Sequence, residues 1–182
     1  MGTDATQLEQ VLHHEACGHG FAKLADEYAY EAYGAISADY AAEIQTQQAE
    51  WGWWKNVDFT SDLEAIRWSH FITDSRYTTE GLGAYEGGLT YWSGVWRPTE
   101  NSIMRYNTGG FNAPSREAIY YRIHKLAYGD SWQYDYEQFT EWDAINRTQA
   151  AVTSALEPMV LRRYEPTPPV VVGKTWREAM NK

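Results

Sequence analysis

The sequence predicts an α+β domain that is mostly helical, with one long irregular region in its middle. Apolar residues recur at helical spacing before residue 73 and again after residue 115. Between these parts, residues 81–114 are dense in Gly, Pro and Asn and show no helical period. The 182 residues are enough for one domain with a substantial core and too few for two of typical size, so we expect a single domain over residues 1–182.

The helices are predicted in order along the chain. The first should begin near Asp4, because Asp4 and Gln7 form a capping-box pattern, and it should run to about Tyr28. A second is expected over residues 37–51 and a short third over residues 62–73. Residues 81–114 should form a long structured loop with at most a short hairpin, and long loops of this kind are usually functional. Two more helices are expected over residues 115–128 and 136–156, before an extended Pro-rich tail.

Composition narrows the classes of partner. The chain has 15 Lys and Arg against 25 Asp and Glu, a formal charge of −10, so binding to a nucleic-acid backbone is disfavoured. No apolar run approaches the roughly 20 residues of a membrane-spanning helix, so no membrane span is expected. Cys17 is the only cysteine, and the chain therefore forms no internal disulfide.

The segment LHHEACGHGFAKLADEY at residues 12–28 carries candidate metal ligands. Zinc hydrolases commonly use HExxH, in which two His four residues apart share a helix face and the Glu is the general base. His14 and His19 are five residues apart, which in a regular α-helix separates their side chains by about 140°. A π-bulge would return both to one face, and Gly18 suits such a distortion. The sequence thus predicts a bulged zinc site in which Glu15 takes the proton of the attacking water.

An unbulged helix would pair these residues differently. His13 and Cys17 are then four residues apart, as are Glu15 and His19, so either pair would bind metal or form a hydrogen bond. The HExxGH spacing also resembles the zinc motif of the dipeptidyl peptidase III family, which binds zinc with the extra residue.

The stretch HEACGHGFAKLADEY at residues 14–28 resembles the signature of the IgA-peptidase family of zinc metallopeptidases, in which HExGH precedes an apolar stretch and L-x-D-E-Y. This chain has one more residue between its Glu and its Gly than that pattern. Other stretches look similar to the family: Asn56-Val57, GAYEGG at 83–88, RPT at 97–99 and SIMR at 102–105. The resemblance spans residues 14–118 and implies a metzincin-like or zincin-like catalytic domain.

The resemblance also implies roles for single residues. Asp26, the acidic residue of L-x-D-E-Y, is our choice as third zinc ligand beside His14 and His19. Glu27 is the second choice, and Glu86 the third. Met104 in SIMRY resembles the methionine of the metzincin Met-turn.

By the same likeness, Tyr106 is a candidate for stabilising the transition state. The activity implied is that of a Zn²⁺-dependent endopeptidase acting on protein or peptide substrates.

Zinc peptidases of this architecture place a β-sheet upstream of the zinc helix, whose edge strand binds the substrate backbone. Only 13 residues precede His14. We therefore expect either that another chain supplies the sheet or, preferably, that this chain is the C-terminal part of a larger enzyme, partnered by an upstream segment of the same precursor. Members of the family are secreted or displayed on the bacterial cell surface, and the resemblance implies the same location here.

A different class of function is also compatible with the composition. The chain has nine Trp and 14 Tyr, and rings cluster at residues 51–54 and 91–96. Such rings line glycan and peptide grooves. The alternative to a peptidase is a non-enzymatic binding module that needs neither metal nor Glu15.

Overall fold

The computed structural model describes residues 5–153. Contacts between residues divide the chain into two compact units, residues 1–143 and 144–182. Of the second unit, residues 144–153 are described, and they are helical. The predicted helix start at Asp4, the helix end at residues 154–156 and the extended tail lie outside the described residues.

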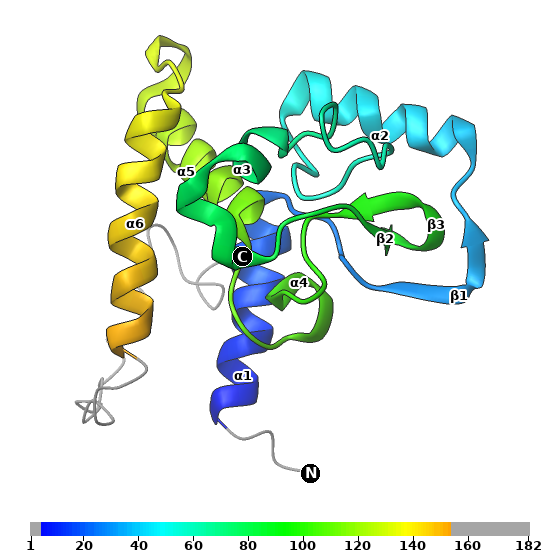
Figure 1. Ribbon diagram of the computed structural model, residues 1–182, viewed down its shortest axis with the longest axis horizontal. Coiled ribbons are helices and arrows are strands. Elements are labelled where there is room, and N and C mark those ends of the chain that lie inside the picture. Colours follow the sequence, from blue (N-terminus) through cyan, green and yellow to red (C-terminus); the bar gives the residue numbers. More distant parts are fainter. Residues whose placement is uncertain (1–4, 154–182) are drawn as a thin grey trace, which may run out of the picture. The chain divides into compact units, whose positions relative to one another are not determined.

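The described chain combines helices with one small sheet (Figure 1). The helices are α1 (Ala5–Leu12), the π-helix η1 (His13–Ala22), α2 (Ala38–Trp51), α3 (Ser69–Thr73), the 3-10 helix η2 (Ser75–Glu80), α4 (Ile103–Tyr106), α5 (Ala113–Tyr128), the 3-10 helix η3 (Gly129–Ser131) and α6 (Tyr136–Thr153). The strands are β1 (Ala29–Ala35), β2 (Tyr85–Gly88) and β3 (Thr90–Arg97). The predicted α+β class is confirmed.

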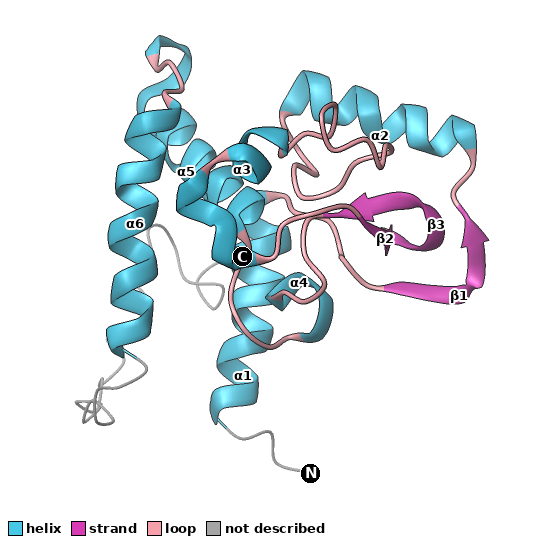
Figure 2. Cartoon of the chain, viewed as in Figure 1, coloured by secondary structure: helices cyan, strands magenta, loops and turns pink. Residues whose placement is uncertain are grey.

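The sheet has the order β1-β3-β2, and β1 runs parallel to β3 while β2 is antiparallel to it (Figure 2). β2 and β3 form the hairpin allowed for within residues 81–114. The prediction that the rest of residues 81–114 is irregular was wrong in part, because β3 spans eight residues and the helix α4 follows it. β1 was not predicted at all. Its residues are mostly exposed, so they show no alternation of apolar and polar side chains that would mark a strand.

Two helix ends also differ from the prediction. The first helical segment ends at Ala22 rather than near Tyr28, because Lys23 takes a left-handed conformation (φ 57°) and its N–H bonds to the carbonyl of Gly18. The third helix is confined to residues 69–73. Upstream of it, the backbone N–H of Arg67 donates to Oδ2 of Asp58 at 2.8 Å, which takes the place of an intrahelical bond. The second helix begins as predicted after its N-cap Ser37, whose hydroxyl accepts the N–H of Tyr40.

The apolar core consists of three clusters within residues 1–143. One is mainly aromatic and includes Trp68, Phe71 and Phe139. A second lies between η1, α4 and α5, and includes Leu24 and Met104, both fully buried. A third joins the sheet to the loop after α2. The second cluster forms the base on which the candidate site is built.

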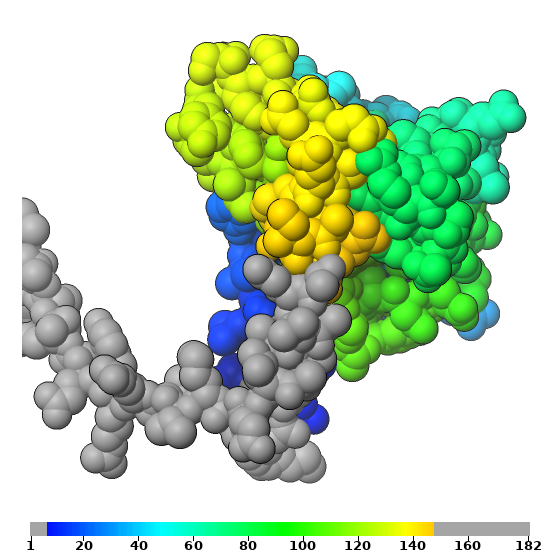
Figure 3. All heavy atoms as spheres, turned by 60° about the vertical axis from the view of Figure 1, so that its left-hand side comes forward, coloured from blue at the N-terminus to red at the C-terminus, as the bar shows by residue number. Residues whose placement is uncertain are grey.

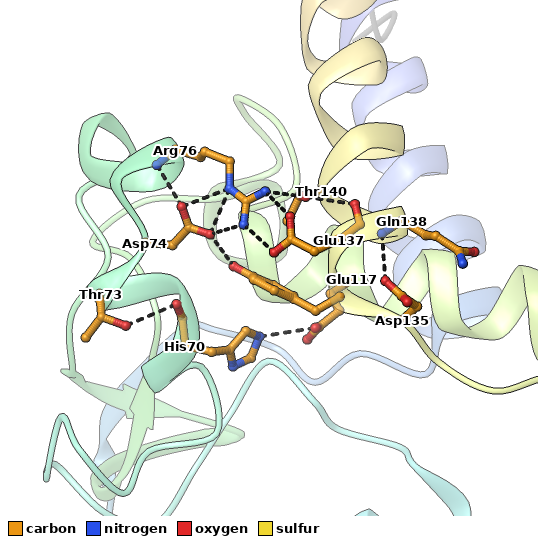
Figure 4. A network of polar contacts seen from close by, with 10 residues as sticks. His70, Thr73, Asp74, Arg76, Glu117, Asp135, Glu137, Gln138 and Thr140 are labelled. Carbon is orange, nitrogen blue, oxygen red and sulfur yellow. Dashed lines mark hydrogen bonds and ion pairs between the residues drawn. The ribbon is translucent and has the colours of Figure 1, made fainter.

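A polar network secures residues 136–143 of α6, which lie against α3 and η2 (Figure 3). Asp74 caps η2 by accepting the backbone N–H of Arg76, and it also accepts the Arg76 guanidinium and the hydroxyl of Tyr136 (Figure 4). The same guanidinium reaches Glu137 at 2.6 Å and Thr140 at 2.7 Å. One arginine therefore connects η2 to the first turns of α6.

Asp74→Asn is expected to lower the free energy of unfolding at neutral pH by about 1 kcal/mol. This is less than hydrogen bonds to a charged group usually contribute, because solvent screens the ion pair between Asp74 and Arg76. Arg76 holds the pKa of the Asp74 carboxyl well below its ordinary value of 3.8. A lowered pKa in the folded state gives stability above pH 4 that is lost as the pH falls further. Urea unfolding at pH 7 and pH 3 should show a smaller difference between wild type and variant at pH 3, where part of this stability has been lost. An equal difference at both values would contradict the ionic contribution.

Within the described residues, no helix is both long enough and apolar enough to cross a membrane.

Candidate metal centre

Three side chains from the start of the chain converge on one point. Nε2 of His14 lies 3.1 Å from Nε2 of His19, and Oδ1 of Asp26 lies 3.1 Å and 3.0 Å from these two atoms. His14 is buried, and the other two are half-buried. The predicted distortion is present and longer than expected, because the whole of His13–Ala22 is π-helical. This winding places residues five apart on one face, which is why His14 and His19 meet.

Gly18 allows the helix to lie directly on Met104. A Cβ atom at Gly18 would stand 2.4 Å from Sδ of Met104 and 2.9 Å from its Cε, closer than real atoms approach. Met104 is fully buried, and α4, which carries it, contacts η1. A soft, unbranched side chain therefore packs below the turn of η1 that carries both His. The packing requires glycine at position 18.

The remaining ring nitrogens define the tautomers. Nδ1 of His14 lies 2.8 Å from the carbonyl oxygen of Ile103, and Nδ1 of His19 lies 2.8 Å from that of Leu24. A carbonyl oxygen only accepts hydrogen bonds, so both Nδ1 atoms carry the proton. Each neutral ring then presents the lone pair of Nε2 to the carboxylate of Asp26. Such orientation of imidazoles by backbone carbonyls is typical of metal-binding His.

Three acceptor atoms that face one another need a cation between them. A proton on an imidazole supplies part of this positive charge. Hydrogen bonding to Asp26 raises the pKa of both His14 and His19, although burial opposes the shift. For Asp26, burial favours a higher pKa, but hydrogen bonds to the two imidazoles outweigh it and the pKa is lowered. The carboxylate is thus an anion in the pH range in which proteins work. The group suits a divalent metal, which would replace the protons.

The spacing fits a small transition-metal ion. A tetrahedral zinc with bonds of about 2.0–2.1 Å places its ligand atoms about 3.3 Å apart, a few tenths of an ångström more than the distances here. Two imidazole nitrogens and one carboxylate oxygen are also a donor set found in catalytic zinc sites. His14, His19 and Asp26 can therefore hold a metal ion.

The two alternative acidic ligands do not join this group. Glu27 is fully buried, and its carboxylate accepts hydrogen bonds from Ser102, Asn56 and Asn112. It follows Asp26 directly but faces the interior, as alternation in extended chain requires. Glu86 lies on β2, where Oε1 accepts the backbone N–H of Gly94 at 3.1 Å.

An open cavity of about 490 Å³ adjoins the metal centre. The predicted catalytic residues Glu15 and Tyr106 both line it, beside His14. Tyr106 is 54% exposed, and its ring lies 4.5 Å from the Arg105 guanidinium, so its hydroxyl is accessible to a ligand. The geometry therefore brings the predicted general base and the predicted tyrosine to one cavity at the metal ligands.

Tyr28 is a site residue that the sequence argument missed. Its hydroxyl is hydrogen-bonded to Asp26, and burial together with the Asp26 charge raises the pKa of Tyr28 to about 12. It therefore remains a neutral donor, which steadies the carboxylate beside the two His. Its ring also lines the cavity. Its place directly after Asp26-Glu27 is the one sequence signal that points to this role.

The two aromatic segments of the binding-module alternative line separate cavities. Trp51 and Trp53 line one cavity with the end of α2, whereas Trp92 of β3 lines another with Glu86 and Arg97. These cavities share no lining residue within the described chain.

Fold and site together define an α+β protein with a candidate His-His-Asp metal centre at the edge of an open cavity. The chain matches no known protein family and no curated protein by sequence comparison.

Proposed function

We propose that the chain is the catalytic part of a zinc-dependent endopeptidase of metzincin-like type, related to the IgA-peptidase family. One observation carries this proposal. The lone pairs of His14 and His19 and one oxygen of Asp26 converge within 3.0–3.1 Å, with both imidazoles oriented by backbone carbonyls. The position of Met104 beneath this group further supports the likeness to the Met-turn.

The chain's own residues divide the work of hydrolysis. His14, His19 and Asp26 would hold zinc, which when bound supplies the Lewis acidity that polarises a peptide carbonyl and acidifies water in the site. Glu15 accepts the proton of the attacking water and delivers it to the leaving amine. Tyr106, exposed in the same cavity, donates its hydroxyl proton in a hydrogen bond to the carbonyl oxygen as negative charge develops there.

The sheet offers a place for the substrate backbone. β1 is an edge strand, and its first residues, Ala29 and Tyr30, line the cavity beside His14. In the part of the chain that the structure describes, no strand pairs with the outer edge of β1. An extended peptide can add to such an edge through main-chain hydrogen bonds. This edge begins three residues downstream of Asp26 and would bind the substrate backbone, the role for which an upstream sheet was expected.

Metal content tests the proposal directly. The purified chain, equilibrated with zinc and then dialysed, should retain about one zinc per chain, as a site with three protein ligands and one open position predicts. His14→Ala should lose it, because two donors remain. His13→Ala is the matched control, since His13 is the exposed neighbour on the same helix and should leave the zinc in place.

The proposal would be contradicted if His14→Ala retained zinc and His13→Ala lost it. The zinc ligands would then be assigned to the His13/Cys17 pair. On the family resemblance we also propose that the protein is secreted or displayed on the cell surface.

A further inference from the structure

A second cavity is basic although the chain as a whole is acidic. It has a volume of about 380 Å³ and lies where the end of η1, the end of α2 and the middle of α5 meet. Five cationic side chains line it: Lys23, Lys55, Arg67, Arg122 and Lys125. They are a third of the 15 Lys and Arg in a chain of formal charge −10. Glu50 is the single carboxylate among the described residues that line it.

Much of this charge is uncompensated. Lys23, Lys55 and Arg122 form no ion pair within residues 5–153. Burial lowers the pKa of the Lys55 ammonium, with the Glu117 carboxylate opposing this shift from a neighbouring cavity. An anion in the cavity would therefore relieve both the desolvation of Lys55 and the mutual repulsion of the cations.

Two buried polar atoms of the lining residues have no hydrogen-bond partner. Nε of Arg122 is a donor without an acceptor. Oε1 of Gln48 is an acceptor without a donor, and Gln48 is only 5% exposed. The amide nitrogen of the same side chain donates to the carbonyls of Trp54 and Val57. Buried polar groups in proteins are nearly always paired, because an unpaired one is costly, so these two atoms point to a missing partner. A ligand that satisfies both must offer an acceptor and a hydroxyl or amine donor.

Aromatic rings complete the lining. The rings of Trp51 and Trp53 lie 4.7 Å apart, and Trp51 is 54% exposed. The ammonium of Lys55 lies 3.8 Å from the ring centre of Tyr121. Exposed indole faces next to cations suit a ligand with an apolar ring face and a charged group.

We propose that this cavity binds a sugar ring carrying a phosphate or sulfate ester. The tetrahedral oxyanion would face the cations and accept from Nε of Arg122, a ring hydroxyl would donate to Oε1 of Gln48, and the sugar face would pack on Trp51 or Trp53. The volume lies in the range of about 300–1,000 Å³ that is common for small-molecule sites. None of the metal ligands lines this cavity, so the inference does not rest on the proposed peptidase.

Calorimetric titration of the full chain, without added zinc, tests the class of ligand. The probes are a hexose 6-phosphate, a hexose 6-sulfate, the neutral hexose and inorganic phosphate. At least one ester should bind tenfold or more tightly than the neutral hexose and more tightly than inorganic phosphate. The tighter of the two esters identifies the source of the oxyanion. Phosphate esters gain their second charge near pH 6, so their binding should tighten from pH 5 to pH 7.5.

Two kinds of variant test whether the ester binds in this cavity: one removes a cation from the lining and the other removes a carboxylate. Arg122→Gln should weaken binding of the tighter ester about tenfold, and Lys23→Gln repeats the test if Arg122→Gln does not fold. Glu50→Gln should strengthen binding, because it removes the one carboxylate. His14→Ala should leave the affinity unchanged, which separates this site from the metal centre.

Three results would overturn the inference: no binding at millimolar ester, equal affinity for ester and neutral hexose, or an affinity unaffected by both cation substitutions.

Discussion

Glu15→Gln should retain zinc and lose peptide hydrolysis by a factor of about 10²–10⁴, the usual contribution of a general base. Glu15 is exposed, lines the cavity beside His14 and takes no part in the His-His-Asp group. The amide keeps the shape of the side chain but accepts no proton at neutral pH. Turnover of a quenched peptide library and zinc content, measured on the same samples, separate lost chemistry from lost metal.

Glu9→Gln is the matched control for this experiment. Glu9 is an exposed carboxylate on α1, the helix that continues into η1, and the substitution removes the same charge. It should change neither zinc content nor turnover. Undiminished hydrolysis by Glu15→Gln would exclude Glu15 as the base. Unchanged hydrolysis after loss of the metal would exclude the zinc mechanism as a whole.

Glu27→Ala should destabilise the protein by about 3–5 kcal/mol, because it unpairs several buried hydrogen-bond donors and leaves a cavity. Its carboxylate accepts from Ser102 Oγ at 2.5 Å, from Asn56 Nδ2 at 2.9 Å and from Asn112 Nδ2 at 3.0 Å. The variant would leave the Ser102 hydroxyl without its acceptor, and the buried amide nitrogens of Asn56 and Asn112 would each lose one of their acceptors. Thermal unfolding should show a midpoint lower by about 10 °C or more for a unit of this size.

Glu31→Ala is the control, because Glu31 lies four residues downstream on exposed β1. Its unfolding midpoint should stay within about 2 °C of wild type, as for other surface substitutions. Comparable midpoints for Glu27→Ala and Glu31→Ala would contradict the structural role of Glu27.

Glu27 also connects several of the scattered segments on which the proposed family resemblance rests. Three of the segments quoted for the resemblance, those containing Asn56, Thr99 and Ser102, meet at or next to this carboxylate. Asn56 also bonds both backbone groups of Ala25 at 2.8 Å. The stretch that carries Asp26 is thereby held from both sides. We therefore infer that these residues position the metal ligand without contacting a metal themselves.

The basic cavity changes how the aromatic residues are interpreted. Sequence reasoning considered residues 51–54 and 91–96 as one groove of a binding module. The structure places Trp51 and Trp53 beside cations in one cavity and Trp92 in another. Binding and hydrolysis therefore need not be competing interpretations of this chain, since the basic cavity and the metal centre share no lining residue.

Much of the candidate metal centre followed from the sequence because its three ligands lie within residues 14–26. For His14 and His19, helical winding and one π-helical distortion decide that the side chains meet, and their spacing in the sequence reflects both. The start of α2 and the α+β class followed from local signals in the same way. The sequence by itself thus determined the pairing of His14 with His19, whereas Asp26 was implied by the family resemblance and singled out from Glu27 and Glu86 by the structure.

Only the tertiary structure decided what surrounds that set. Tyr28 donates to Asp26 because the chain turns after Lys23, and Glu27 faces away because it meets donors up to 85 residues distant. β1 pairs with β3 although its exposed side chains carry no strand pattern. The basic cavity joins η1, α2 and α5 in the same manner. Contacts between residues so far apart in the sequence depend on the packing of the whole core, so they cannot be predicted from local spacing.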